Sequence, residues 1–231
     1  MSCDRGLRHD QPRGLIEAVI FDLDGLLIDS EQAWDDVRRE FVAEHGGRWR
    51  DRAQQDMMGM SSPEWSRYVG EELGVGLPPQ RINEEVVARI IALYRTELPL
   101  LPGARGAVER LAQRWPLGLA SSSNREVIDL VLDVAGLAPY FGVTVSSEEV
   151  AHGKPAPDVY LAAAGALGAR PSACAAIEDS RNGILSAAAA GMRVIAIPNP
   201  AFPPGVEALA AAAEILPALD SLTAEVVGSR G

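Results

Sequence analysis

AVIFDLDGLLIDS, residues 18–30, is the stretch of this sequence that decides the fold. Its first four residues are all apolar, which is typical of a central strand covered on both faces. Asp22 and Asp24 follow directly, and two residues that are two apart in extended chain point to the same side. Gly25 permits the sharp exit that the end of such a strand needs. Because ligands bind at the carboxyl ends of strands in open α/β sheets, we expect both carboxylates at a binding site.

The composition indicates a globular protein that does not bind nucleic acid. The 231 residues, 47% of them hydrophobic, suffice for one domain with an insertion. A net charge of −11 disfavours broad contact with nucleic-acid phosphates. Cys3 and Cys174 are the only cysteines, which argues against a disulfide framework and fits a reducing compartment. With no apolar run long enough for a membrane span, we expect a cytoplasmic monomer that contacts no membrane.

The segment after the opening stretch differs in character from the rest of the chain. Residues 1–14 are polar and without periodicity, so we expect a flexible tail. Residues 31–98 show only helical spacing, as in the series Val86, Ile90 and Tyr94, interrupted by Gly- and Pro-containing breaks. We therefore expect a small helical cap at 31–98, inserted into a catalytic core formed by residues 15–30 and 99–231.

From Gly103 onward, helical and strand patterns alternate. Strands are expected at residues 117–120, 143–145, 173–177 and 194–197, with helices between them. Ser123 and Glu126 have the spacing of a capping box and are expected to open one of these helices. Repeated β-α-β order with short connections predicts an α/β fold, a Rossmann-like parallel sheet with helices on both faces.

Further polar residues occur where the predicted strands end. Ser121 follows the second strand, and Glu178 with Asp179 follows the fourth; Lys154 lies in the loop between them. Parallel strands bring these tips to one edge. Clustered carboxylates repel one another unless a cation is present, and hard oxygen ligands select Mg²⁺, which also binds substrate phosphates.

These residue types suit phosphoryl transfer. Asp22 can attack phosphorus to give an aspartyl-phosphate intermediate, and Asp24 can protonate the leaving oxygen. Ser121 and Lys154 can hold the phosphoryl oxygens. Each residue also has a commoner role, since Lys154 alone suggests an exposed charge, Ser121 or Asp179 alone a helix cap, and Asp-x-Asp alone a turn. The occurrence of all of them in order favours an enzyme.

The motifs resemble those of the haloacid dehalogenase-like hydrolases in their phosphatase branch, with a helical cap after the first motif. Four segments over residues 15–200 carry the likeness: Phe21-Asp22-Leu23-Asp24-Gly25, Leu119-Ala120-Ser121-Ser122, Lys154-Pro155-Ala156-Pro157-Asp158 and Ile177-Glu178-Asp179-Ser180. The resemblance implies Asp22 as nucleophile and metal ligand, and Asp24 as acid/base that ligates metal through its carbonyl oxygen. It places the phosphoryl-binding residues at Ser121, Ser122 and Lys154. It places the remaining Mg²⁺ ligands at Asp179 and Glu178.

The nearest likeness is to the β-phosphoglucomutase and sugar-phosphate phosphatase subgroup. The second aspartate, Asp24, favours phosphoryl transfer over dehalogenation. The mutase has a His where Trp34 stands and an Arg shortly after the Gly of the cap loop, where this chain reads Gly59-Met60-Ser61-Ser62. We therefore expect a Mg²⁺-dependent phosphatase acting on a small phosphorylated metabolite such as a hexose, hexitol or 2-deoxyglucose 6-phosphate. A sugar phosphomutase and a non-catalytic phosphate-sensing module are the alternatives. Trp34 is a candidate substrate-binding residue, with packing inside the cap as its other role.

Overall fold

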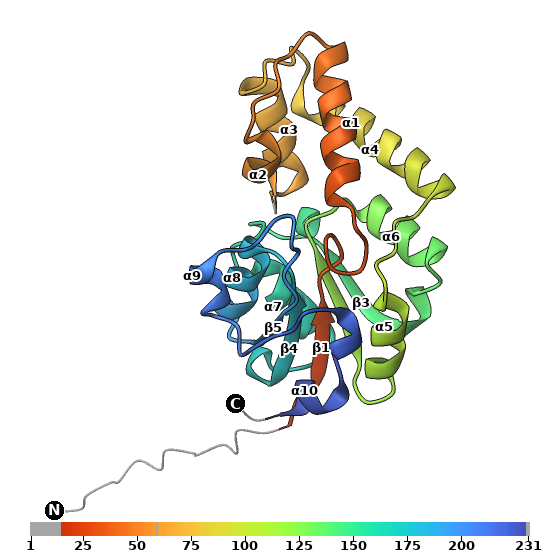
Figure 1. The fold of residues 1–231 in the computed structure, drawn as a ribbon, viewed down its shortest axis with the longest axis vertical. Helices are drawn as coiled ribbons and strands as arrows, with labels where there is room; N and C mark the ends of the chain where they lie inside the picture. Colours follow the sequence, from red (N-terminus) through yellow and green to blue (C-terminus); the bar gives the residue numbers. More distant parts are fainter. Residues whose placement is uncertain (1–14, 59, 230–231) are drawn as a thin grey trace, which may run out of the picture.

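Strand β1 (Ala18–Phe21) lies near the centre of a parallel sheet (Figure 1). The computed structural model describes residues 15–58 and 60–229, so the expected tail at 1–14 lies outside the described part. Within it, the sheet has six strands in the order β3-β2-β1-β4-β5-β6. The other strands are β2 (Leu117–Ser121), β3 (Phe141–Ser146), β4 (Cys174–Glu178), β5 (Arg193–Ala196) and β6 (Glu214–Ile215).

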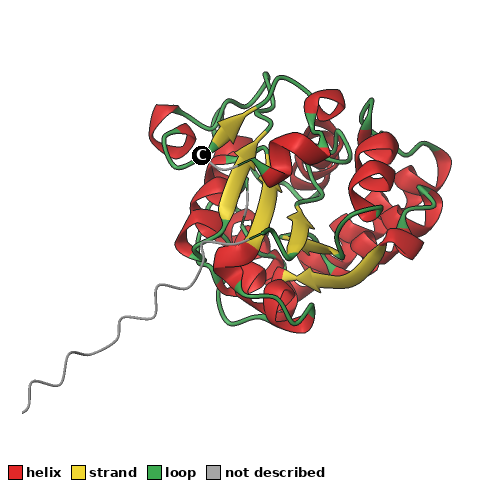
Figure 2. Cartoon of the chain, turned by 90° about the horizontal axis from the view of Figure 1, so that it is seen from below, coloured by secondary structure: helices red, strands yellow, loops and turns green. Residues whose placement is uncertain are grey.

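Both faces of this sheet are covered, which explains the unbroken apolar run of β1. Val19 and Phe21 belong to one core cluster, whereas Ala18 and Ile20 belong to another on the opposite face. The first cluster includes helices α5 (Ala104–Ala112) and α6 (Arg125–Val134). The second includes α7 (Asp158–Ala166) and α8 (Arg181–Ala189). Figure 2 shows the sheet between these helices, which confirms the expected α/β class.

Residues 31–98 contain helices and, in their described part, no strand of the sheet. They form α1 (Glu31–Glu44), α2 (Ala53–Met57), α3 (Ser62–Glu71) and α4 (Pro79–Thr96). These helices stand together beyond one end of the sheet (Figure 1). Their interior contains Trp34 and Trp65, whose rings meet edge to face with centroids 6.0 Å apart. We infer that this segment is the inserted cap.

The two chain crossings between this helical segment and the sheet run side by side. The backbone N–H of Asp29 donates to the carbonyl oxygen of Pro99 at 2.8 Å, and that of Leu101 donates to Leu27 at 2.9 Å. Ile28 and Leu100 thereby form an antiparallel bridge. This pairing supports boundaries for the insertion near residues 30 and 98.

Several elements differ from the sequence-based expectation. The spacing of Val108, Leu111 and Trp115 predicts one helix through all three, but α5 ends at Ala112 and the Trp115 indole N–H donates to the Ile16 carbonyl at 2.9 Å. Short elements were not predicted because they contain too few residues to show periodicity. They are α2, β6, α9 (Val206–Leu209), α10 (Ala224–Gly228) and the 3-10 turns Ala138–Tyr140, Ser147–Glu149, Pro171–Ala173 and Leu219–Ser221. None of the helices within the described ranges combines the length and apolarity that crossing a bilayer requires.

Candidate active site

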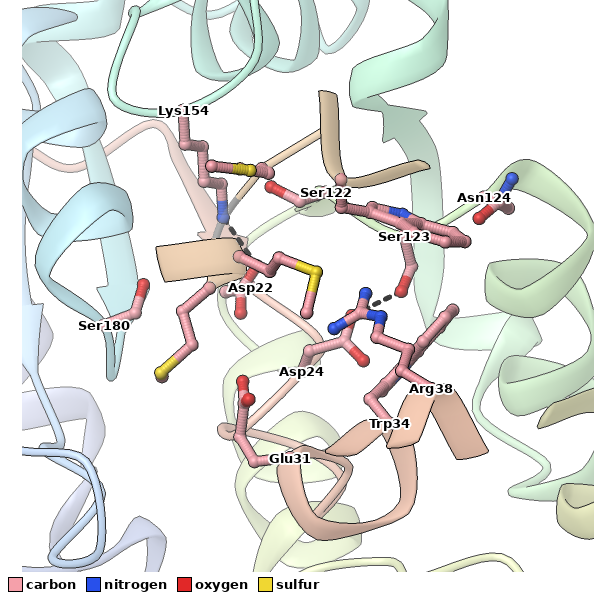
Figure 3. A pocket seen from close by; sticks show the side chains of 14 residues that line it. Asp22, Asp24, Glu31, Trp34, Arg38, Ser122, Ser123, Asn124, Lys154 and Ser180 are labelled. Atoms are coloured by element: carbon pink, nitrogen blue, oxygen red, sulfur yellow. Dashed lines mark hydrogen bonds and ion pairs between the residues drawn. The ribbon is translucent and has the colours of Figure 1, made fainter. Parts of the chain in front are cut away.

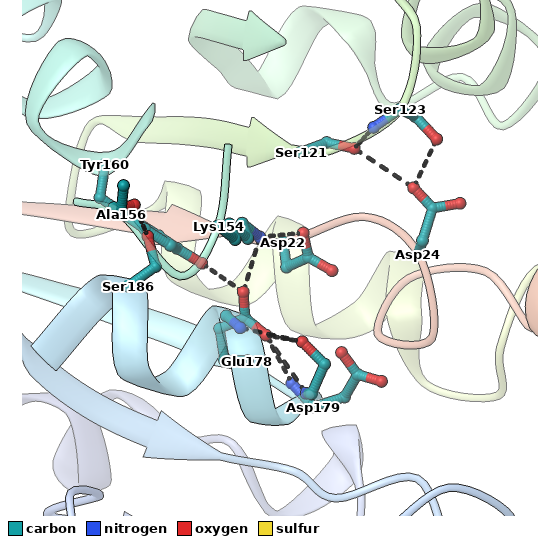
Figure 4. Close-up of polar contacts among 12 residues, drawn as sticks. Asp22, Asp24, Ser121, Ser123, Lys154, Ala156, Tyr160, Glu178, Asp179 and Ser186 are labelled. Atoms are coloured by element: carbon teal, nitrogen blue, oxygen red, sulfur yellow. Dashed lines mark hydrogen bonds and ion pairs between the residues drawn. The ribbon is translucent and has the colours of Figure 1, made fainter. Parts of the chain in front are cut away.

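The register of the sheet brings the polar strand tips together. Phe21 of β1 pairs with Leu119 of β2 on one side and with Ile177 of β4 on the other. The residues that follow these positions therefore emerge at the same edge, as Figure 4 shows for Asp22, Ser121 and Asp179. Lys154 reaches the same edge from the loop that precedes α7.

Lys154 bridges two of the carboxylates. Its Nζ lies 2.6 Å from Asp22 Oδ1 and 2.6 Å from Glu178 Oε1, and all three side chains are buried (Figure 4). Burial alone would lower the pKa of Lys154, but the charges of Asp22 and Glu178 raise it above its ordinary value. Lys154 is therefore a permanent ammonium. Burial raises the pKa of Asp22 to about 8. The negative charges of Glu178 and Asp24 also raise it, whereas the positive charge of Lys154 lowers it.

Glu178 is fully buried and its two oxygens accept several hydrogen bonds. Besides Lys154, the Tyr160 hydroxyl donates to Oε1 at 2.8 Å. The backbone N–H of Asp179 donates to Oε2 at 3.1 Å, and the Ser180 hydroxyl donates there at 3.1 Å. Glu178 thus fixes Lys154 to the start of α8, where Ser180 is the N-cap.

The residues at this edge fit a hard divalent cation. Carboxylate oxygens of Asp22, Glu178 and Asp179 all lie within 4.8 Å of one another. Asp179 Oδ1 is buried without a hydrogen-bond partner, and burial raises the pKa of Asp179 well above its ordinary value, with the charges of Glu178 and Asp22 adding to this effect. Gly25 has φ +78°, and a Cβ there would lie 2.2 Å from Asp179 Oδ2. Buried, mutually repelling oxygens of this kind are suited to Mg²⁺.

The Asp24 side chain is held apart from this group of oxygens. Ser123 Oγ donates to Asp24 Oδ2 at 2.7 Å, and Ser121 Oγ donates to the same oxygen at 3.2 Å. The expected capping box is wrong, because α6 begins at Arg125 with Asn124 as its N-cap. The hydroxyl of Ser123 instead fixes Asp24 (Figure 4). Ser123 is thus a site residue that the sequence interpretation assigned to a helix end.

A small cavity of about 60 Å³ lies between the strand tips and the helical segment (Figure 3). Of the residues singled out from sequence, it is lined by Asp22, Asp24, Trp34, Ser122 and Lys154. The segment at residues 57–62 contributes Met57, Met58 and Met60. The lining residues that sequence reasoning missed are Glu31, Arg38, Trp65, Ser123, Asn124 and Ser180.

A usable signal for two of the missed residues was present in the sequence. Glu31, Trp34 and Arg38 are spaced i, i+3 and i+7 on α1, so they share one face of that helix. Trp34 was recognised, and its neighbours on that face follow from it. By contrast, the position of the Asn124 side chain depends on where α6 begins. The capping-box spacing placed that start one residue too early.

Comparison with known proteins gives a consistent result. The family model described as haloacid dehalogenase-like hydrolase matches residues 16–191. Hexitol phosphatase B of Escherichia coli is 38% identical over 192 residues, which are 82% of this chain and 86% of the relative. The fructose-1-phosphate phosphatase YqaB of the same organism is 29% identical, covering 77% of this chain and 94% of that protein.

A solved structure shows the same architecture. CbbY from Rhodobacter sphaeroides, crystallised with xylulose-1,5-bisphosphate, superposes with a TM-score of 0.83 at 26% identity. The match covers 93% of this chain and 100% of that one. Together with the family match over most of the sequence, this likeness leaves one assignment: the chain belongs to the haloacid dehalogenase-like hydrolases.

Proposed function

We propose that the protein is a Mg²⁺-dependent phosphatase that hydrolyses a small sugar or polyol monophosphate. The observation that carries the proposal is the separation of two carboxylates at one strand tip. Asp22 is buried against Lys154, whereas Asp24 is hydrogen-bonded to two serines on the other side of the chain. The names of the hexitol and fructose-1-phosphate phosphatases support the substrate class.

In the proposed first step, a carboxylate oxygen of Asp22 attacks phosphorus and the bond from phosphorus to the substrate's ester oxygen breaks. The departing oxygen takes the proton of Asp24, so that a neutral alcohol leaves. The phosphoryl group remains on Asp22 as a mixed anhydride. Ser123, at 2.7 Å, orients the Asp24 carboxyl for this transfer, and the Ser121 hydroxyl, which makes the longer contact of 3.2 Å, turns to the phosphoryl group when substrate binds.

Lys154 and the serines after β2 hold the phosphoryl group. The ammonium donates to Asp22 and Glu178 and has a third N–H for a phosphoryl oxygen. Ser121 lies across Asp22 from Lys154 (Figure 4), and Ser122 lines the cavity near Lys154 (Figure 3). Asp22 and Asp179 would bind Mg²⁺, with Glu178 adding charge beside them; when bound, the ion neutralises the phosphoryl oxygens.

The second step returns the enzyme to its starting state. Asp24, now a carboxylate, takes a proton from a water molecule that attacks phosphorus. The bond from phosphorus to Asp22 breaks and inorganic phosphate leaves.

A mutase would need the released alcohol to return in another orientation. Trp34, which packs against Trp65 and Arg38, narrows the cavity at the position where the mutase has a His.

Two substitutions test the proposal. Asp22→Asn should fold, as shown by a cooperative thermal transition, and release no phosphate from any monoester. Asp24→Asn should lose about 10²- to 10⁴-fold in kcat on alkyl phosphates. Its loss on p-nitrophenyl phosphate should be much smaller, because p-nitrophenolate leaves without a proton. Mg²⁺ affinity, measured by titration calorimetry, should persist in Asp24→Asn and fall in Asp179→Ala.

The outcomes separate the alternatives. Phosphate release by Asp22→Asn at the wild-type rate would refute the assignment of Asp22 as the nucleophile. Isomerisation of glucose 1-phosphate in the presence of a bisphosphate activator, without phosphate release, would identify a mutase. A lack of activity toward every monoester in Mg²⁺ would favour a non-catalytic phosphate-binding module.

A further inference from the structure

We propose that Arg38, Gln54 and Glu31 form a subsite that binds hydroxyl groups of a neutral, polyhydroxylated leaving group. The inference rests on the phosphatase activity proposed above and names the part of the substrate that the helical segment selects. All three residues lie on helices α1 and α2, and Arg38 and Glu31 line the cavity (Figure 3). Arg38 and Glu31 belong to its wall on the side of the helical segment, and Gln54 contacts both of them.

Arg38 is a buried cation whose hydrogen-bonding capacity is largely unused. Its guanidinium carbon lies 4.6 Å from the Trp34 ring centroid and 4.7 Å from that of Trp65, and the two centroids are 6.0 Å apart, so the cation sits in the angle between the two rings. The residue is 7% exposed, and no carboxylate oxygen in the described ranges lies within 4.0 Å of it. The indole rings stabilise the charge but accept no conventional hydrogen bond, so the N–H groups in the plane of the guanidinium need other partners.

The edge of Arg38 has one weak polar contact. Its Nη1 lies 3.5 Å from Gln54 Oε1, at the limit of a hydrogen bond, and its Nε is buried without a partner. Buried charged donors are normally satisfied, so a donor left open beside a cavity points to a ligand. Arg38 is therefore placed to donate in its own plane to oxygen atoms of a bound molecule.

Gln54 connects this donor to an acceptor. Its Nε2 donates to Glu31 Oε2 at 2.7 Å, while its amide oxygen faces Arg38. This link keeps the Glu31 carboxylate and the Arg38 guanidinium on the same side of the cavity. A sugar or alditol hydroxyl both donates and accepts, so a pair of hydroxyls suits this combination.

The charges at the subsite favour a neutral group over a second anion. Above about pH 7, where Glu31 is a carboxylate, its charge offsets the positive charge of Arg38, and Asp24 adds negative charge nearby. A second phosphate or a carboxylate would have to approach both carboxylates with a single cation to offset them. The geometry thus points to an aldose, ketose or alditol monophosphate, and it disfavours bisphosphates and phosphorylated carboxylic acids.

The experiment measures kcat and KM of the full chain with Mg²⁺ on four probes: sorbitol 6-phosphate, fructose 1,6-bisphosphate, 2-phosphoglycolate and p-nitrophenyl phosphate. The wild type should prefer sorbitol 6-phosphate to the two more highly charged probes. In Arg38→Met, kcat/KM for sorbitol 6-phosphate should fall about 10- to 100-fold, mainly through KM, as expected for a lost charge-assisted hydrogen bond. The loss on p-nitrophenyl phosphate, which has no hydroxyl, should be at least tenfold smaller. The kcat/KM of Arg38→Lys for sorbitol 6-phosphate should lie between the values for the wild type and Arg38→Met.

Arg39→Gln is the matched control. Arg39 is the next residue of α1, but it is exposed and pairs with Asp35 at 2.9 Å, away from the cavity. It should leave the ratio between the probes unchanged.

Equal losses on sorbitol 6-phosphate and p-nitrophenyl phosphate in both Arg38 variants would overturn the subsite, since they would show a purely structural role. A wild-type preference for the bisphosphate or for 2-phosphoglycolate would overturn the neutral-ligand assignment. Absence of activity on all four probes would instead overturn the proposed phosphatase, on which the subsite depends.

Discussion

Glu31 gives the helical segment a pH-dependent stability. Burial raises the pKa of Glu31 from 4.5 to about 7, and the charge of Asp24 adds to this effect. The folded protein therefore holds this proton more tightly than the unfolded chain does. The resulting stabilisation is complete below pH 4.5 and is lost as the pH rises through about 7.

Glu31→Gln, which is neutral at every pH, isolates this contribution. Between about pH 4.5 and about pH 8, the wild type should lose up to about 3 kcal/mol of unfolding free energy relative to the variant. Urea denaturation of both proteins in EDTA measures the difference. Parallel pH profiles for the two proteins would contradict the predicted shift. The control Glu44→Gln removes an exposed carboxylate of the same helix and should not reproduce the effect.

Helix α8 begins directly over the Glu178 carboxylate, and its packing there leaves no room for a side chain. A Cβ at Gly183 would lie 1.8 Å from Glu178 Oε1, so Gly183→Ala has to displace the group that holds Lys154. We expect a loss of about 2–4 kcal/mol in stability together with a fall in kcat. Thermal denaturation and phosphate release measure the two effects.

Gly165 in α7 provides the matched substitution. It is also helical, but a Cβ there would meet nothing within 4 Å. Gly165→Ala should therefore stabilise the protein by about 0.5–1 kcal/mol, since alanine is the better helix former. The prediction is wrong if the two variants change stability in the same direction.

The sequence predicted the elements that sit at the centre of the sheet. Strand β1 was placed at its observed bounds, because burial on both faces produces an unmistakable apolar run. The meeting of the polar strand tips at one site followed from this strand, since the carboxyl ends of parallel strands lie at the same edge of a sheet. Elements of two to five residues, such as β6 and α2, were missed because their formation depends on neighbours far along the chain.

The site was predictable where it depends on strand ends and unpredictable where it depends on packing. Asp22, Lys154 and Asp179 come together because of the topology alone. The positions of Arg38 and Gln54 depend on how α1 and α2 turn toward the core, which no local pattern records. Trp34 packs against Trp65 and also lines the cavity, and its role in substrate binding stays a prediction.

In the observed arrangement the helical segment closes over the strand tips, and residues of both line the cavity between them (Figure 3). Two hydrogen bonds join the helical segment to the core there: Asn182 Nδ2 donates to the Met58 carbonyl at 3.0 Å, and Asn124 Nδ2 donates to Asn83 Oδ1 at 3.2 Å. Both contacts favour this closed arrangement.

Asn182→Ala should weaken the closed arrangement. Loss of one hydrogen bond of about 1 kcal/mol should raise KM for sorbitol 6-phosphate about fivefold, because closure around the substrate becomes less favourable. Steady-state kinetics check this value. Asn199→Ala serves as the control, since the Asn199 side chain accepts only from the nearby Ala201 N–H. An unchanged KM in Asn182→Ala would show that this contact has no part in closure.

The paired crossings at Asp29–Pro99 and Leu27–Leu101 have an evolutionary consequence. The chain leaves the sheet and re-enters it at almost the same point, so the length and sequence of residues 31–98 are decoupled from the position of Asp22. Insertions, deletions or wholesale exchange between those crossings need not disturb the reacting groups. If the proposed subsite on this segment selects the leaving group, substrate preference can diverge in evolution without a change in the residues that react with the phosphoryl group.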